Sequence, residues 1–394
     1  MNLRNTLFAA SFTLALACSG SGTTAGSGSA ALDAATPSYA ALSMDQVSTD
    51  ATISANAPTA LTSAPQPDVM LSGDGCHPHL FLRQREVVER VNRHIYKALR
   101  HVEVAIARNP LSATDDTKTW ESVENGIDRK FTITLVSADV YSWELDIGPV
   151  GTTPLPVVMT GQIDRTGATG PHQGKGTFHI DFARLHAGYP SERVTQGTLD
   201  VSFDVEATSR NLTVTATDVA WDLDATRFSS AAMVTALSAP RSGAYVYYRE
   251  PGKGGSLKIE DQMVYVCPAN PALVPADAQL VSRWYKASDT TIHGRSDAFM
   301  KGGQLAAPVD HLAAVTCQTG QREGDEQAEG FWLMKAEDAS GNTISGESSQ
   351  DLGESTTACD PIFGVVPELT DNHDDFTGWP SSYSDGTPFP FPNM

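Results

Sequence analysis

The chain has 394 residues, of which 40% are hydrophobic, so it can bury a core and a wholly disordered protein is excluded. Its formal net charge is −20, from 27 Lys and Arg against 47 Asp and Glu. A nucleic-acid-binding protein needs a basic face to replace the counterions on phosphates, so the charge argues against that class.

Residues 1–17 predict an export signal. Arg4 precedes an apolar stretch, Thr6 to Ala17, that is too short to cross a bilayer as a mature helix. The sequence Leu14-Ala15-Leu16-Ala17-Cys18 resembles the lipobox of bacterial lipoproteins, with Ala15 where that family usually has leucine. The resemblance implies that Cys18 is lipidated and becomes the new N-terminus. Ala15-x-Ala17 also fits an ordinary secretory cleavage site, which would leave Cys18 unmodified.

The cysteine count agrees with lipidation, because five cysteines leave one over in an exported protein. The other four can form two disulfides in an oxidising compartment, with three possible connectivities. These candidates are Cys76, Cys267, Cys317 and Cys359. Ser19 follows Cys18, so the aspartate that retains many lipoproteins in the inner membrane is absent. We therefore expect an outer-membrane lipoprotein, facing the periplasm or the cell surface and held to the membrane by its N-terminal lipid.

Residues 18–75 predict a disordered tether. After Cys18 the segment is rich in Ser, Gly, Ala and Thr, carries five aspartates and has no Lys or Arg. Such a composition buries too little apolar surface to offset the entropy of ordering the chain. A flexible linker of this kind is expected to hold the folded part away from the membrane.

A long amphipathic helix is predicted from His79 to about Arg108. Its apolar residues recur at spacings of three and four, which places them on one side of a helix. Pro78 suits a first helical turn, and Asn109-Pro110 predicts the end. The apolar positions are Val87, Val88, Val91, Ile95, Ala98, Leu99, Val102, Ala105 and Ile106.

After Pro110 the hydrophobic period changes to two, which predicts β-strands. Short polar turns separate the strands, so antiparallel pairing is favoured. The strands of this part are predicted at Phe131–Leu135, Tyr141–Ile147, Val157–Ile163, Gly176–Leu185, Thr198–Ala207, Leu212–Trp221, Ala244–Arg249 and Leu257–Cys267. Residues 76–267 are thus expected to form an α+β, mainly β domain in which the helix packs on a curved antiparallel sheet. This architecture resembles the open-barrel periplasmic lipoprotein carriers, without a shared motif.

Prolines 268, 271 and 275 predict a boundary. Residues 268–353 then form either a smaller second β unit or extra strands on the same sheet. Residues 354–394 predict an acidic, Pro- and Gly-rich irregular tail. From residue 318 onward there are 15 acidic residues against two basic ones.

Four short motifs resemble a segment of uncharacterised, β-rich exported lipoproteins of myxobacteria. They are Arg283-Trp284-Tyr285-Lys286, Gly294-Arg295-Ser296-Asp297, Gly302-Gly303 and Thr316-Cys317. The resemblance covers about a quarter of the chain, and it implies no activity.

Few residues suggest metal chemistry. Cys76-His77-Pro78-His79 is the densest cluster of zinc-ligand types, although Cys76 can equally form a disulfide and His77-Pro78 can mark a helix start. Asp371-Asn-His373-Asp-Asp375 offers oxygen ligands for calcium, yet it lacks the spacing and the central glycine of a dedicated calcium loop. A solvated acidic tail explains it as well. No cofactor is therefore expected.

His94 and His101 flank the apolar side of the helix and could line a groove where the helix meets the sheet. They could equally be boundary residues with an apolar body and a polar tip.

Hydrolase signatures are missing: there is no Gly-x-Ser-x-Gly, His-Glu-x-x-His or Ser-x-x-Lys set with its partner motifs. We therefore expect a non-catalytic protein that binds an unknown small ligand or protein partner, or a structural surface protein. A carrier predicts an apolar pocket between helix and sheet, and a structural protein predicts a pocketless exterior. The alternative is a secreted, metal-assisted hydrolase that uses the region from Cys76 to His79.

Overall fold

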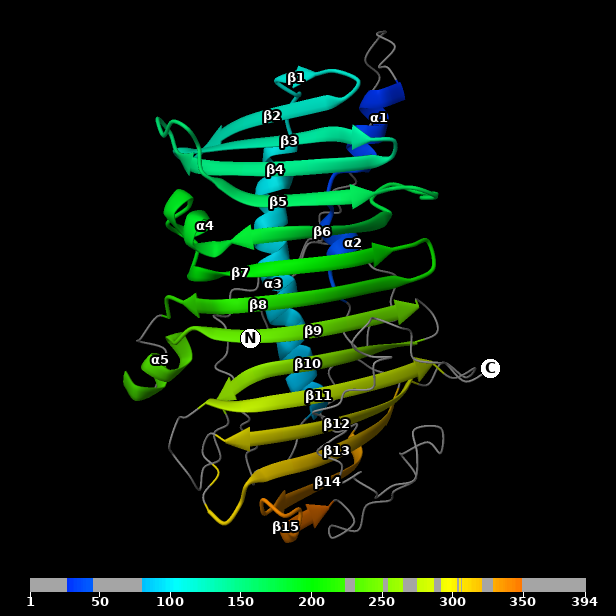
Figure 1. The fold of residues 1–394 in the computed structure, drawn as a ribbon, viewed down its shortest axis with the longest axis vertical. Coiled ribbons are helices and arrows are strands. Elements are labelled where there is room, and N and C mark those ends of the chain that lie inside the picture. The colour runs from blue at the N-terminus through cyan, green and yellow to red at the C-terminus, as the bar shows by residue number, and fades with distance from the viewer. Residues whose placement is uncertain are drawn as a thin grey trace, which may run out of the picture.

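The computed structural model describes residues 27–44, 80–223, 231–250, 254–264, 275–286, 292–302, 305, 307–320 and 329–348. These residues are mainly β, as predicted, and form one open antiparallel sheet of 15 strands (Figure 1). Each strand pairs with its neighbours in the sequence, from β1 at one edge to β15 at the other. The fold is therefore a single long meander.

The strands are β1 (Ser112–Ala113), β2 (Thr117–Glu124), β3 (Ile127–Ser137), β4 (Val140–Pro149), β5 (Val157–Asp164), β6 (Gly174–Asp181), β7 (Val194–Val205), β8 (Arg210–Trp221), β9 (Arg241–Glu250), β10 (Gly254–Val264), β11 (Pro275–Lys286), β12 (Ile292–Gly302), β13 (His311–Gly320), β14 (Glu329–Glu337) and β15 (Thr343–Ser348). The helices are α1 (Ser27–Ala34), α2 (Tyr39–Leu42), α3 (Leu80–Ile106), α4 (Phe182–Gly188) and α5 (Ala231–Ser238).

Alternation of apolar and polar residues gives the sheet one buried face and one wet face. In β4 the residues Tyr141, Trp143, Leu145 and Ile147 are buried, whereas Glu144 between them is exposed. Because side chains alternate across a strand, the register carries this division from strand to strand. Leu145 pairs with Phe131 of β3, for example, and both lie in the core.

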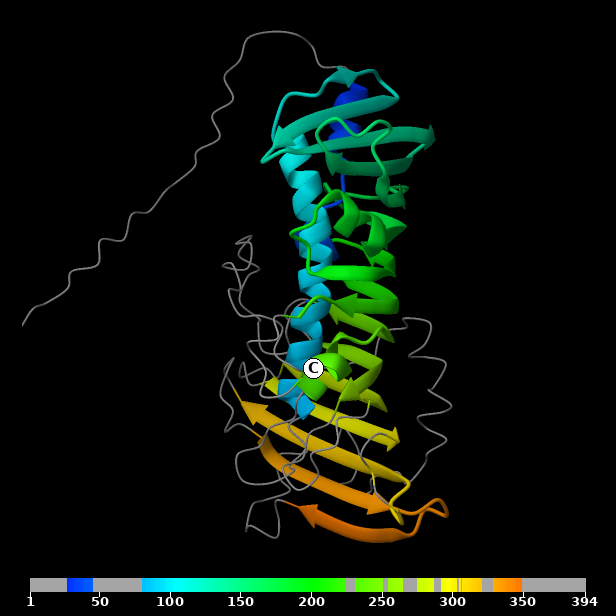
Figure 2. The ribbon, with the colours of Figure 1, turned by 90° about the vertical axis from the view of Figure 1, so that its left-hand side faces the viewer.

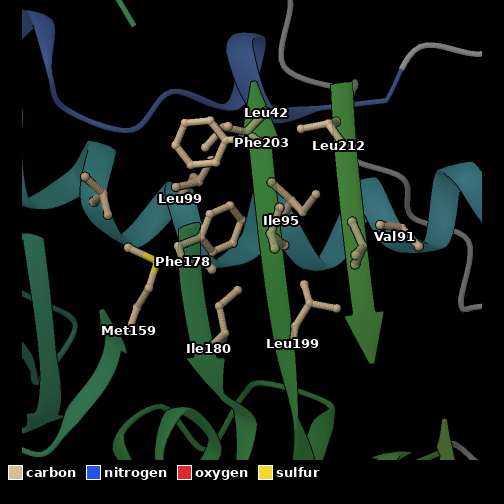
Figure 3. Close-up of a cluster of buried hydrophobic side chains, with 14 of the residues drawn as sticks. Leu42, Val91, Ile95, Leu99, Met159, Phe178, Ile180, Leu199, Phe203 and Leu212 are labelled. Carbon is tan, nitrogen blue, oxygen red and sulfur yellow. The ribbon is translucent and has the colours of Figure 1, made fainter. Parts of the chain in front are cut away.

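Helix α3 lies along the buried face and runs across the strands (Figures 1 and 2). It contacts β2 and β3 near its C-terminal end and β11, β12 and β13 near its N-terminal end. In the region between, large apolar side chains fill the space: Val91, Ile95 and Leu99 of α3 meet residues of β6–β8 (Figure 3). The strand residues labelled in this cluster are Met159 of β5 together with Phe178, Ile180, Leu199, Phe203 and Leu212.

A close approach explains one glycine of the core. Gly161 of β5 pairs with Trp143 of β4, and the indole ring lies over it. A Cβ at this position would clash with that ring and would lie 2.8 Å from the carbonyl oxygen of Thr177. The absence of a side chain at residue 161 is what admits the tryptophan to the core.

The prediction of a separate second β unit is wrong, and the alternative of extra strands on the same sheet holds. β10 and β11 pair over eleven residues, from Gly254 opposite Tyr285 to Val264 opposite Pro275. The strands on either side of the predicted boundary, β10 and β11, are therefore hydrogen-bonded neighbours, and Pro275 is the first residue of β11. The core also continues across these strands. Ile259 of β10 pairs with Leu280 of β11, which pairs with Ala298 of β12, and all three belong to or pack against the core.

The prediction of a disordered tether over residues 18–75 is wrong for residues 27–44. These residues form α1 and α2 and lie beside α3 (Figure 1). Their apolar side chains Leu32, Ala35, Leu42 and Met44 are buried in the core. The composition of residues 18–75 is an average over 58 positions, most of them small or polar. This average does not reveal the few apolar residues that are buried. We call residues 27–44 the strap.

The predicted strand Gly176–Leu185 is also too long. β6 ends at Asp181, and α4 begins at the next residue. The carboxylate of Asp181 accepts a hydrogen bond from the backbone N–H of Arg184 at 3.0 Å, which is the N-cap that starts the helix. The predicted tail, residues 354–394, lies outside the described residues.

Within the described part of the chain, no helix combines the length and the apolar run needed to cross a bilayer.

Candidate functional site

A groove crosses β8–β12 on the face of the sheet that α3 does not cover. Its central row consists of residues that pair in register across five strands: Thr215, Ala244, Glu260, Gln279 and Phe299. The next positions along the strands add Thr217, Ser242, Asp277 and Lys301 to the lining. The groove has a volume of about 520 Å³, within the range of roughly 300–1,000 Å³ typical of small-molecule sites.

A bulge in β8 shapes one end of the groove. The register between β8 and β9 shifts between Ala216 and Val219, and Asp218 adopts a positive φ of 51°. The backbone N–H of Asp218 donates to the hydroxyl of Ser242 at 3.0 Å. Gly197 of β7, with a φ of 92°, lies against the carbonyl oxygens of Thr217 and Asp218, so a side chain there would not fit. The bulge turns this end of β8 out of the regular ladder.

The groove displays hydrogen-bonding groups of several kinds. The Gln279 amide donates to Glu260 Oε1 at 3.3 Å, and Asp277 pairs in register with Lys301. Glu260, Asp277 and Lys301 are exposed, whereas Asp261 is buried and accepts from the Tyr245 hydroxyl at 3.0 Å. The exposed groups can therefore meet a ligand, while Asp261 supports the wall.

A cluster of polar side chains built around the buried His311 lies at the other end of the groove. His311 Nε2 lies 3.0 Å from Glu337 Oε2, and His311 Nδ1 lies 3.2 Å from Asp310 Oδ2. Each ring nitrogen of His311 thus faces a carboxylate, one from the neighbouring residue and one from β14. Lys301 Nζ lies 3.0 Å from the same Asp310 oxygen. Hydrogen bonds from Lys301 and His311 lower the pKa of Asp310.

The imidazole of His311 also packs on Phe299, with ring centroids 5.0 Å apart. His311 and Glu337 are each only 1% exposed, so they are held within the fold and do not line the groove. Their contacts instead position Phe299 and Lys301, which do. The cluster thus holds the side chains of Phe299 and Lys301 in position in the groove.

The predicted histidines of α3 lie elsewhere, between the helix and α4. His94 packs on the rings of Phe182 and Trp221, at centroid distances of 5.4 and 5.8 Å. His101 Nδ1 accepts from Arg129 Nε at 3.0 Å, and its ring packs edge-on against Tyr189. Both histidines are 6% exposed, and neither lines the groove across β8–β12.

An ion pair that the sequence did not predict lies between these histidines. Lys97 Nζ lies 2.5 Å from Glu192 Oε1, and Glu192 is nearly fully buried. The same oxygen accepts from the backbone N–H groups of Arg193 at 2.8 Å and Val194 at 3.2 Å. This flank of α3 is therefore closed by a satisfied polar network and by aromatic rings.

Most of the predicted chemistry-bearing residues lie outside the described part of the chain. These are Cys18, Cys76, His77, His79, Cys267, Cys359 and the Asp371–Asp375 cluster. Cys317 lies in β13, where it pairs in register with Arg295 and Phe331. The disulfide and zinc hypotheses thus stay predictions. Among the described residues, no three His, Cys, Asp or Glu side chains come together as a metal site would require.

The groove residues were missed because no local pattern connects them. Glu260, Gln279 and Phe299 belong to three different strands, and each simply alternates with buried or half-buried residues. Alternation predicts that they share a face, but the register that aligns them depends on turns and bulges.

No known family model matches the chain, and it has no significant match among curated proteins or solved structures.

Proposed function

We propose that this chain is an exported, membrane-anchored lipoprotein whose folded body binds a hydroxyl-rich ligand, such as a glycan, in the groove across β8–β12. The lipobox-like sequence ending at Cys18 supports both export and attachment to the membrane by a lipid. The groove is the observation that supports binding. A purely structural surface protein gives no reason for a groove of about 520 Å³ in an otherwise regular sheet face.

The lining favours a neutral, polyhydroxylated ligand. Carboxylates and amides, such as Glu260 and Gln279, accept and donate hydrogen bonds to hydroxyl groups. Phe299 supplies an apolar surface on which the C–H face of a sugar ring can pack. Lys301 is already engaged by Asp310, and the exposed carboxylates of Glu260 and Asp277 would repel a strongly anionic ligand.

Calorimetric titration with cellohexaose, chitohexaose and maltohexaose tests this proposal. We expect one of the three to bind, and Gln279→Ala or Glu260→Gln to weaken binding at least tenfold. Gln279→Ala removes a hydrogen-bonding amide and Glu260→Gln replaces a charged acceptor with a weaker neutral one, each change costing about 1.5 kcal/mol. Glu144→Gln is a matched control, since Glu144 is an exposed carboxylate on the same face of the sheet, in β4. Absence of binding by all three sugars would contradict the ligand class. Equal binding by all variants would contradict the groove.

A further inference from the structure

The docked strap fixes which end of the sheet lies near the N-terminus. Helix α1 contacts β2 and β3, and Asp33 of α1 forms an ion pair of 2.5 Å with Lys118 of β2. Further along the strap, the carbonyl of Thr36 lies 2.7 Å from His172 Nδ1. Helix α1, which begins at Ser27, therefore lies at the β1–β3 end of the sheet (Figure 1).

Chain length then limits where the anchor can be. Only nine residue steps separate Cys18 from Ser27, and an extended chain spans at most about 3.6 Å per residue, so the reach is about 30 Å. Fifteen strands at about 4.8 Å spacing give the sheet a contour of roughly 65 Å. A lipid on Cys18 can thus lie beside the β1–β3 end but cannot extend to β15.

The same end carries most of the exposed apolar side chains. Of the five large hydrophobic residues that are prominently exposed in the described part of the chain, four belong to β1–β4 or to residues directly flanking these strands. They are Leu111, Val123, Val136 and Val150, with exposures between 50% and 64%, and the fifth is Ile344 of β15.

We propose that the β1–β4 end of the sheet is a membrane-docking surface that rests on the lipid headgroups beside the anchor. The inference builds on the proposed lipidation of Cys18. Burial of apolar side chains at the interface would add a second membrane contact beside the lipid anchor. Docking would place the sheet upright on the membrane, with the groove in β8–β12 held away from it.

The charge of this end selects the kind of lipid. Its exposed charged residues include Asp115, Asp116, Glu121 and Glu124, against Arg100 and Arg108. Such a surface is repelled by anionic headgroups, so the contact depends on apolar burial. We expect it on zwitterionic phosphatidylethanolamine–phosphatidylcholine vesicles and expect phosphatidylglycerol to weaken it.

Photo-crosslinking on these vesicles tests the proposal. The full mature protein, purified from membranes, is reconstituted with a diazirine-bearing phospholipid, and adducts are mapped by mass spectrometry. We expect adducts in β1–β4 and none in β13–β15. A combined variant, Leu111→Ser with Val123→Thr, Val136→Thr and Val150→Thr, should lose them. Ile344→Thr is the matched control at the opposite end and should retain them.

The intact mass of the mature protein separates two kinds of failure. An acylated N-terminus with adducts spread evenly over the sheet, or with adducts unchanged in the combined variant, would overturn the docking surface and leave the proposed lipoprotein intact. An unmodified N-terminus would overturn the anchor and, with it, this inference.

Discussion

Arg129 Nε donates a hydrogen bond to His101 Nδ1 across 3.0 Å and so joins β3 to α3 inside the protein. Burial lowers the pKa of His101 to about 4, and the neighbouring charges of Arg129, Arg100 and Lys97 act in the same direction. The folded protein thus holds a neutral histidine at a pH where an unfolded chain, with a pKa near 6.5, would be protonating it.

This histidine should make stability fall in mild acid. Between pH 6.5 and 4 the unfolded chain takes up a proton that the folded chain does not, so the free energy of unfolding decreases as the pH is lowered. The separation of the two pKa values corresponds to about 3 kcal/mol when the pH reaches 4. His101→Gln keeps an acceptor for Arg129 but cannot titrate, so its unfolding free energy, measured in urea, should depend less on pH in this interval.

The control for this experiment is Gln162→Ala, because Gln162 is exposed in β5 and carries no titratable group. It should not flatten the pH dependence. If the curves of wild type and His101→Gln run parallel from pH 6.5 to 4, the proposed linkage is absent.

Asn92 holds the strap to α3. Its side-chain oxygen accepts from the backbone N–H of Met44 at 2.6 Å, and its amide donates to the carbonyl of the same residue. Asn92→Ala leaves both backbone groups without this partner, which should cost about 1–3 kcal/mol. Hydrogen exchange should show faster exchange in residues 36–44, with smaller changes in β3 and β4.

Arg100→Ala is a matched control on the same helix, since Arg100 is exposed and its guanidinium pairs with Glu103. An exposed pair of this kind contributes about 0–1 kcal/mol. If Arg100→Ala releases the strap as strongly as Asn92→Ala does, the role assigned to Asn92 is wrong.

The contact between Gly161 and Trp143 should tolerate no added methyl group. Gly161→Ala forces the indole ring or the backbone near Thr177 to shift, and overpacking of this kind costs about 1–3 kcal/mol. Thr160→Ala, at the adjacent exposed position, should change stability far less. Urea unfolding measures both variants, and near-ultraviolet circular dichroism reports the displaced tryptophan. Equal stability of Gly161→Ala and wild type would contradict the tight packing.

The four later cysteines can be tested together with the zinc hypothesis. If these cysteines form two disulfides, none of them keeps a free thiol. Alkylation without reduction should then leave Cys76, Cys267, Cys317 and Cys359 unlabelled. A disulfide-bonded Cys76 cannot supply a thiolate to zinc, so we expect the purified protein to contain no stoichiometric zinc. Free thiols together with one zinc per chain, lost in His77→Ala, would favour the hydrolase hypothesis.

Local periodicity predicted much of the fold. The alternation in Tyr141–Ile147 and Leu212–Trp221 indicated strands close to the observed β4 and β8. Composition was a poorer guide, because the few apolar residues of the strap, such as Leu32 and Leu42, bury fully despite their Ser- and Gly-rich surroundings. The cap that ends β6 and starts α4 depends on one side chain, Asp181, within an otherwise strand-like run.

The groove could not have been found from the sequence. Its residues meet only through the register of five strands, and the bulge at Asp218 that shapes one end rests on Gly197 of the preceding strand. The buried pair of His311 and Glu337 is likewise set by the pairing of β13 with β14, 26 residues apart along the chain.

The sequential order of the strands has a consequence for folding. Every strand bonds only to its neighbours along the chain, as in a repeat protein, so a sheet alone could unravel from either edge in stages. Helix α3 breaks this locality, because it touches β2 and β3 at one end and β11–β13 at the other. It therefore couples distant strands into one cooperative unit, and the all-or-none character of unfolding should depend on this helix more than on any single strand pair.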